Sequence, residues 1–138
     1  MVVYWDASAL VAVIGRAPGA QHYRAVGQQS GITTWWGTFV ECASAIARRA
    51  REGTAPAQVA ESYRMLHKLA AQWREIGCSE ALRRAATRML KMHALSAADA
   101  MQLGAALLAA HYEPGTVRFL SEDRQLTRAA EYEGFLVD

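Results

Sequence analysis

Four carboxylates lie far apart along the chain, yet each stands where an apolar, strand-like run gives way to a helix or where a helix begins: Asp6, Glu41, Asp99 and Asp123. In an open α/β sheet the strand-to-helix junctions gather at one edge, so acids remote in sequence can converge on one crevice. Carboxylates without cysteine or histidine suit Mg²⁺ or Mn²⁺, because hard cations prefer oxygen ligands. The sequence therefore predicts one shared acidic metal site.

Each acid also has an ordinary structural interpretation. The segments Thr38–Glu41 and Ser96–Asp99 match the capping box of a helix start. Asp123 falls in a first helical turn, where negative charge favours the helix dipole, and Asp6 could cap the helix after the first strand. Taken together, however, several acids at one sheet edge would repel one another, and a divalent cation would relieve that repulsion.

The elements that must position these acids are short strands separated by helices. Each strand is a brief apolar run, and the first lacks polar alternation, which is typical of a strand covered on both faces. The expected strands are Val2–Trp5, Ile32–Trp35, Val117–Leu120 and Phe135–Val137. Strands separated by helices imply right-handed crossovers and a parallel sheet.

Helical periodicity, caps and Gly or Pro breakers set the expected helices. Ser8 is a candidate cap for the first of them. The helices span residues 7–14, 20–28, 38 to a stop at 53, 56–77, 79–93, 96 to the Pro114-Gly115 break, and 121–123 onward to Gly134. No repeat or linker interrupts the chain, and we expect a single domain over residues 1–138.

Composition places the chain among ordinary globular proteins. Hydrophobic content of 52% with 20% charged residues excludes a disordered chain as the default. The longest apolar stretches, such as Ala105–Ala110, are far shorter than the ~20 residues that cross a bilayer, and we expect a cytoplasmic protein without membrane association. Cys42 and Cys78 lack the spacing of a zinc site or disulfide framework, so both are expected to be buried thiols.

The charge pattern permits a nucleic-acid partner. The net charge of +2 is only mildly basic, but Arg84, Arg88 and Lys91 share one face of the fifth expected helix and could follow a phosphate backbone. An ordinary solvated face explains them equally well. Arg124, next to Asp123, is a further candidate contact, and Arg48 follows Glu41 along its helix.

Four segments in order resemble the PIN domain, particularly the VapC type of toxin ribonuclease. The first is Val2–Ser8, the second is Glu41 in its helix, the third is Leu95–Leu103 and the fourth is Phe119–Leu126. Pieces such as Asp-Ala-Ser are weak alone, but the ordered set spans nearly the whole chain. The resemblance implies a PIN-like three-layer α/β/α fold with a central, mainly parallel sheet of four to five short strands flanked by helices.

The resemblance also implies roles for particular residues. The four acids match the family positions that hold one or two Mg²⁺ or Mn²⁺ ions and catalyse hydrolysis. Ser8 and Ser121 match small hydroxyl positions that hydrogen-bond the acids. The fourth acid has a neighbour, Glu122, and we favour Asp123 because its spacing from Ser121 matches the family pattern.

The function implied is that of a Mg²⁺- or Mn²⁺-dependent endoribonuclease, the toxin of a type II toxin–antitoxin pair. Its partners would be RNA (tRNA, rRNA or mRNA), a cognate antitoxin protein and a second copy in a homodimer. Two alternatives stay open: a PIN nuclease of general RNA processing, and a non-catalytic PIN-like RNA-binding module. A receiver-type phosphorylation switch fits poorly, since one acid rather than a pair follows the first strand.

Overall fold

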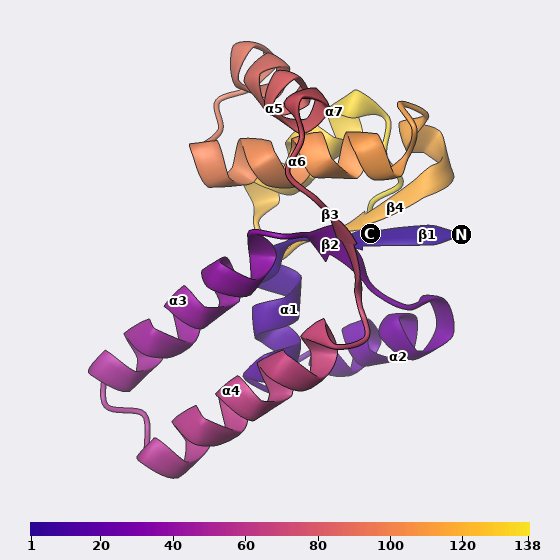
Figure 1. Cartoon of the computed structure of the whole chain (residues 1–138). Coiled ribbons are helices and arrows are strands. Elements are labelled where there is room, and N and C mark those ends of the chain that lie inside the picture. The colour runs from indigo at the N-terminus through magenta and orange to yellow at the C-terminus, as the bar shows by residue number, and fades with distance from the viewer.

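The computed structural model, which describes residues 1–138, is built around four parallel strands (Figure 1). They are β1 (Val2–Trp5), β2 (Thr33–Trp35), β3 (Arg74–Ile76) and β4 (Val117–Leu120). Their order across the sheet is β3-β2-β1-β4, and every pair is parallel. All the strands therefore end at the same edge of the sheet.

Helices cover both faces of this sheet. On one face lie α1 (Ala7–Ile14), α2 (Ala20–Ser30), α3 (Thr38–Arg51) and α4 (Pro56–Ala70). On the other lie α5 (Glu80–Met92), α6 (Ala97–Ala109) and α7 (Arg124–Glu133), and a 3₁₀ turn at Pro114–Thr116 precedes β4. The predicted three-layer α/β/α fold with a parallel sheet is confirmed.

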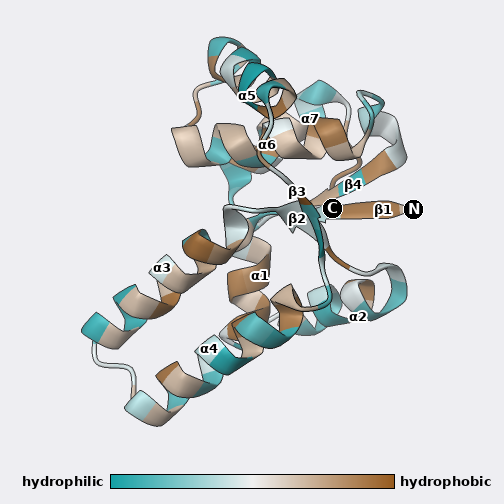
Figure 2. Cartoon of the chain, viewed as in Figure 1, coloured by the Kyte–Doolittle hydropathy of each residue, from teal (hydrophilic) through white to brown (hydrophobic).

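Strand β1 shows why its sequence is apolar throughout. Tyr4 packs into the core beneath α5, α6 and α7, whereas Val3 and Trp5 pack into the core beneath α1–α4. Successive side chains of a strand point to opposite faces, and both faces here are covered. Figure 2 accordingly shows β1 in the brown of hydrophobic residues along its length.

Strand β3 corrects one expectation. The helix expected to continue to residue 77 ends at Ala70, and Arg74–Ile76 is a strand paired with β2. As an edge strand, β3 has a neighbour on one side only, and Arg74 and Glu75 are exposed. Because it is short and polar, it lacks the apolar run by which the inner strands are found.

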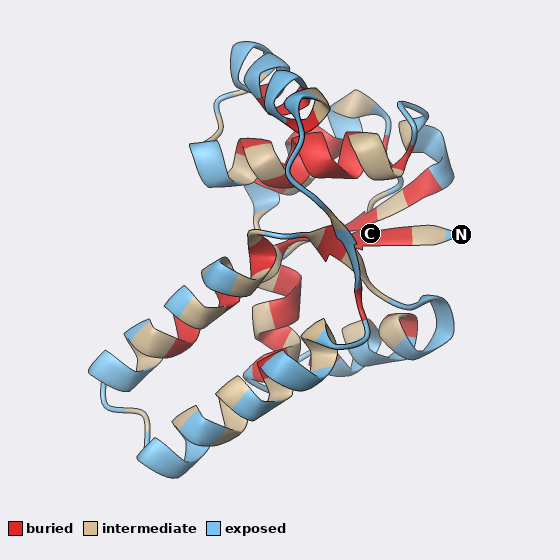
Figure 3. Ribbon diagram, in the orientation of Figure 1, coloured by how far each residue is buried: buried red, intermediate tan, exposed pale blue.

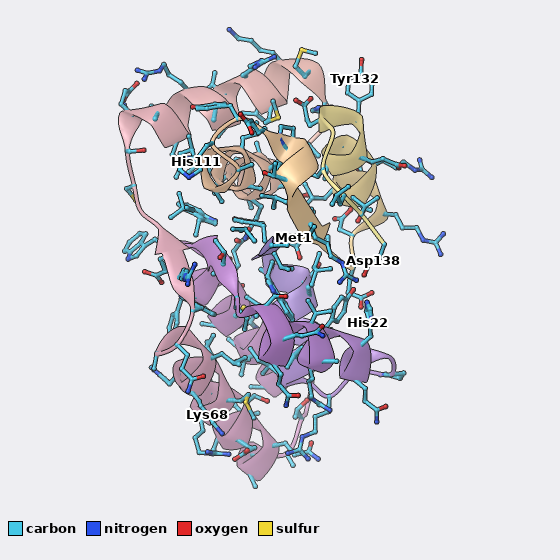
Figure 4. All side chains as sticks on the ribbon, turned by 90° about the vertical axis from the view of Figure 1, so that its right-hand side faces the viewer. Met1, His22, Lys68, His111, Tyr132 and Asp138 are labelled. Atoms are coloured by element: carbon cyan, nitrogen blue, oxygen red, sulfur yellow. The ribbon has the colours of Figure 1, made fainter.

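The expected last strand is also corrected. Residues 135–137 form a single isolated bridge, between Leu136 and Arg118 of β4, instead of a strand. The chain end is nevertheless held: the carboxylate of Asp138 pairs with His22 of α2 at 2.9 Å and accepts from Arg118 Nε at 2.8 Å. Figure 4 shows the labelled His22 and Asp138 next to each other.

Three smaller differences concern caps and burial. Asp6, rather than Ser8, caps α1, and Gly37 rather than Thr38 precedes α3, without a side-chain cap. Cys42 is buried as expected, but Cys78 is exposed.

None of the helices is both long enough and apolar enough to traverse a bilayer.

Candidate functional site

One cavity, of about 290 Å³, opens at the edge of the sheet where β1 and β4 end. All four acids proposed from the sequence contribute to its lining, although they come from four different places in the fold. Its walls are Asp6, Ala7, Ser8, Val11, Glu41, Ala45, Arg48, Asp99, Gln102 and Asp123. The expected convergence of remote carboxylates is therefore present.

Asp6 is the most enclosed of the four, with 3% of its surface exposed. Its Oδ1 accepts from the Ser8 hydroxyl at 2.7 Å and from the Ala9 backbone N–H at 3.1 Å, which caps α1. Its Oδ2 accepts from the Ser121 hydroxyl at 2.8 Å. A carboxylate offers about four acceptor positions, so Oδ2 keeps one for a ligand in the cavity.

Burial controls the ionisation of Asp6. It raises the pKa of this carboxyl to about 6, against the effect of the hydrogen bonds from Ser8, Ala9 and Ser121, and the charge of Asp99 raises it further. The protein thus keeps a carboxylate at the end of β1 where water solvates it poorly.

Glu41 lies in the first turn of α3 and faces the same cavity. Burial raises its pKa to about 7, and the charges of Asp6 and Asp99 act in the same direction. Its Oε2 accepts from Gln102 Nε2 at 2.5 Å. The side chain of Trp35 also lies close enough to lower the pKa of Glu41, although its indole N–H forms no hydrogen bond. One oxygen of Glu41 is therefore held by the protein, and the other accepts no hydrogen bond.

Asp99 and Asp123 stand at the starts of two helices on the opposite face of the sheet. Ser96 caps α6 by accepting from the backbone N–H of Asp99 at 3.1 Å. Asp123 caps α7 itself, because its Oδ1 accepts from the Leu126 N–H at 3.0 Å. Burial and the charge of Asp123 raise the pKa of Asp99. Asp99 and Asp123 thus stand at helix starts, as the capping interpretation has it, and also line the shared cavity.

Two serines tie the ends of β1 and β4 to each other. The Ser121 hydroxyl, besides donating to Asp6, accepts from the Asp123 N–H at 2.9 Å. The Ser8 hydroxyl accepts from the Glu122 N–H at 2.8 Å. Glu122 itself is exposed and does not line the cavity, whereas Asp123 does.

The basic residues proposed to contact RNA lie outside this cavity. Arg84, Arg88 and Lys91 are exposed on α5, and Arg124 is exposed at the start of α7. The cavity contains one cation, Arg48, which follows Glu41 by two helical turns. None of the salt bridges in the molecule involves the four acids.

The residue that the sequence interpretation missed is Gln102. It lines the cavity, is 1% exposed and hydrogen-bonds Glu41. One signal was available: it follows Asp99 by three residues, and residues so spaced share a helix face.

The donor set fits a hard divalent cation. The acids offer oxygen alone, and burial, with a smaller contribution from mutual repulsion, raises the pKa values of three of them. No three His, Cys, Asp or Glu side chains form a group that could hold an ion as they stand. Mg²⁺ keeps several waters and usually takes one or two carboxylates directly. Some of the four acids can therefore bind the cation directly and the others through its waters.

Comparisons with known proteins support the fold alone. No family model matches the sequence, and no curated protein matches it. The structure is similar to the crystal structure of PAE2754 from Pyrobaculum aerophilum, with a TM-score of 0.70 and 19% identity over 99% of this chain and 90% of that chain. The α/β architecture is thus one that a solved protein shares.

Proposed function

We propose that the chain is a Mg²⁺- or Mn²⁺-dependent ribonuclease that hydrolyses phosphodiester bonds in the acidic cavity. The observation that carries this proposal is that Asp6, Glu41, Asp99 and Asp123 line one cavity where β1 and β4 end. The sequence resemblance to PIN domains of the VapC type points to the same four residues. The proposal takes its reaction from that resemblance and its geometry from the cavity.

The side chains present would divide the work of the reaction. Asp6 and Asp99 would hold the principal cation, and Glu41 and Asp123 would contribute directly or through water. A bound divalent cation lowers the pKa of water and neutralises negative charge that develops on a phosphate. Ser8 and Ser121 keep both oxygens of Asp6 in place, and Arg48 offers the cavity a positive group for the substrate's phosphate.

Substrate and partners belong to the same proposal. RNA is the substrate class that the resemblance implies, and the exposed row of Arg84, Arg88 and Lys91 gives α5 a surface suited to a phosphate backbone. A cytoplasmic toxin of this type would be blocked by a cognate antitoxin and would act as a homodimer.

The direct test is cleavage of a mixed pool of tRNA, rRNA and mRNA by the purified chain. We expect endonucleolytic products with Mg²⁺ or Mn²⁺ and none with EDTA. Asp6→Asn should abolish cleavage and leave the fold intact, because asparagine caps a helix as well as aspartate does. Glu61→Gln, on α4 and outside the acidic cavity, is the matched control and should cut at the wild-type rate.

Two results would contradict the proposal. One is an Asp6→Asn protein that cuts RNA at the parental rate, and the other is wild-type cleavage that persists in EDTA. RNA binding without any cleavage would favour the non-catalytic RNA-binding module instead.

A further inference from the structure

A chain of buried hydrogen bonds runs behind Glu41, on the side away from solvent. Tyr4, Thr34 and Thr38 are 0% exposed, and Gln102 is 1% exposed. The Tyr4 hydroxyl donates to Gln102 Oε1 at 2.8 Å, and Gln102 Nε2 donates to Thr38 Oγ1 at 3.0 Å and to Glu41 Oε2 at 2.5 Å. The Thr34 and Thr38 hydroxyls lie 2.6 Å apart, and Thr34 Oγ1 donates to the Trp5 carbonyl at 2.8 Å.

The donor and acceptor roles along this series of hydrogen bonds are fixed by its last member, the Trp5 carbonyl. The Trp5 carbonyl can only accept, so the single hydrogen of Thr34 is used there. Thr38 must therefore donate to Thr34, which leaves its oxygen to accept from an N–H of Gln102. The amide of Gln102 is thereby oriented with its nitrogen toward Glu41 and its oxygen toward Tyr4. A flipped amide would leave the Trp5 carbonyl without the Thr34 donor or would place two acceptors together.

Burying the polar side chain of Gln102 on α6 has a cost in folding free energy. The rest of the buried face of this helix is apolar: Ala100, Leu103, Gly104, Ala105, Ala106 and Leu107. Burying an amide costs free energy unless its hydrogen bonds are made, and an apolar side chain of the same length would pack there without that requirement. The one feature of Gln102 that packing alone does not explain is its reach from α6 to the Glu41 carboxylate on the other helical layer.

We propose that Gln102 is a positioning residue that fixes the Glu41 carboxylate, committing Oε2 to the protein and leaving Oε1 to meet the cation. This inference rests on the proposed function, since it concerns the same acidic cavity. Asp6 shows the same division: Oδ1 is fully used by Ser8 and Ala9, and Oδ2 keeps an open position. Partners that orient metal ligands in this way typically change metal affinity by about 10- to 100-fold when removed.

The test is a double-mutant cycle on Mn²⁺ affinity, measured by calorimetry without RNA. Gln102→Met keeps the side-chain length and removes the amide, and we expect it to weaken Mn²⁺ binding about tenfold. Glu41→Gln should also weaken binding. In the Glu41→Gln background, Gln102→Met should have no further effect, because the residue it positions is already neutral.

A second variant guards against misfolding. Gln102→Met leaves the buried Tyr4 hydroxyl without its acceptor, so Tyr4→Phe/Gln102→Met removes both polar groups and should keep the tenfold loss in a well-folded protein. Tyr4→Phe alone keeps the bond from Gln102 to Glu41 and should bind Mn²⁺ nearly as the wild type does.

Different failures have different meanings. Wild-type Mn²⁺ affinity in the folded Gln102→Met or Tyr4→Phe/Gln102→Met protein would overturn the positioning role and leave the proposed function standing. An equal loss in the wild-type and Glu41→Gln backgrounds would also overturn it, since Gln102 would then act through packing. A wild-type chain that binds no Mn²⁺ would remove the proposed function and this inference with it.

Discussion

The two helical layers that sandwich the sheet are packed very differently. In α6, seven of 13 residues are buried, whereas in α4 Leu66 alone is buried among 15. Figure 3 shows red concentrated in α6 and pale blue over much of the outer parts of α3 and α4. In Figure 1 these two helices lie side by side and extend away from the sheet. One layer is a dense platform, and the other ends in an exposed helical pair.

The acidic cavity lies at the junction between these layers. Asp99 and Gln102 belong to the dense layer, Glu41 belongs to the more exposed one, and Asp6 follows the central strand β1. Because the two layers are packed differently, no single rigid element positions the whole site. Glu41 has to be fixed relative to the residues of the other layer, and the hydrogen bond from Gln102 makes that connection.

The largest expected effect tests whether both layers supply the site. Asp99→Asn in the dense layer and Glu41→Gln in the exposed layer should each lower RNA cleavage by about a hundredfold or more, because each removes a charge that faces the cavity. Initial rates with saturating Mg²⁺ measure this. Each layer offers its own control outside the cavity, Glu80→Gln on α5 and Glu61→Gln on α4. A loss confined to one layer would break the idea of a shared site.

The packing difference itself can be tested with one glycine from each layer. A Cβ added at Gly104 of α6 would lie 2.8 Å from the backbone nitrogen of Ala86 in α5, whereas one added at Gly27 of α2 would lie 3.5 Å from Trp5 Cζ2, an ordinary contact. Alanine favours a helix over glycine by about 1 kcal/mol. Gly27→Ala should therefore raise the free energy of unfolding by about 0.5–1 kcal/mol.

Gly104→Ala should do the opposite. Forcing a methyl group against the backbone of a packed helix typically costs about 1–3 kcal/mol, which exceeds the helical gain. Urea denaturation of the two variants beside the wild type measures both changes. Equal changes of the same sign would show that the two layers tolerate added volume alike.

The third prediction concerns pH and the charges held between the layers. Burial raises the pKa of Asp6 to about 6 and that of Glu41 to about 7. Between about pH 4 and pH 7 the folded protein therefore binds protons that the unfolded chain has released. Without divalent cations, the free energy of unfolding should fall by roughly 3 kcal/mol or more as pH rises through this window, since each unit of pKa shift corresponds to about 1.4 kcal/mol, and then level off.

Two comparisons isolate the cause. In Asp6→Asn the free energy of unfolding should fall less steeply with pH, because the Asp6 carboxyl, the more deeply buried of the two, is no longer there to titrate. Millimolar Mg²⁺ should restore stability above pH 7 in the wild type by binding the folded state. A wild-type stability that rises with pH over the same window in EDTA would contradict this account.

Residues differ in how far sequence alone could place them. The four acids could be predicted because the convergence of parallel strand ends follows from topology, and each acid stands at such an end or at a helix start. Gln102 was missed although it follows Asp99 by three residues, because that spacing alone does not separate a site residue from a packing residue, and its hydrogen bonds to Tyr4 and Thr38 across the core are set by the tertiary structure. Strand β3 was missed because an edge strand with two exposed charged residues resembles a helix end.

The smallest expected effect concerns the outer surface of the dense layer. Arg84 and Arg88 on α5 are exposed, and neither forms a salt bridge with the acids of the cavity. If α5 follows the RNA backbone, Arg84→Gln or Arg88→Gln should weaken RNA binding a few-fold, lower the salt slope of the binding constant by about one, and leave Mn²⁺ affinity unchanged.

Arg64→Gln on α4, where the guanidinium is already paired with Glu61, is the control from the exposed layer. Binding to the Asp6→Asn protein, which we expect to be inactive, titrated over a range of salt, separates this effect from cleavage. A larger loss from Arg64→Gln than from the α5 variants would place the RNA on the α3–α4 side, and the dense layer would then serve only to hold Asp99 and Gln102.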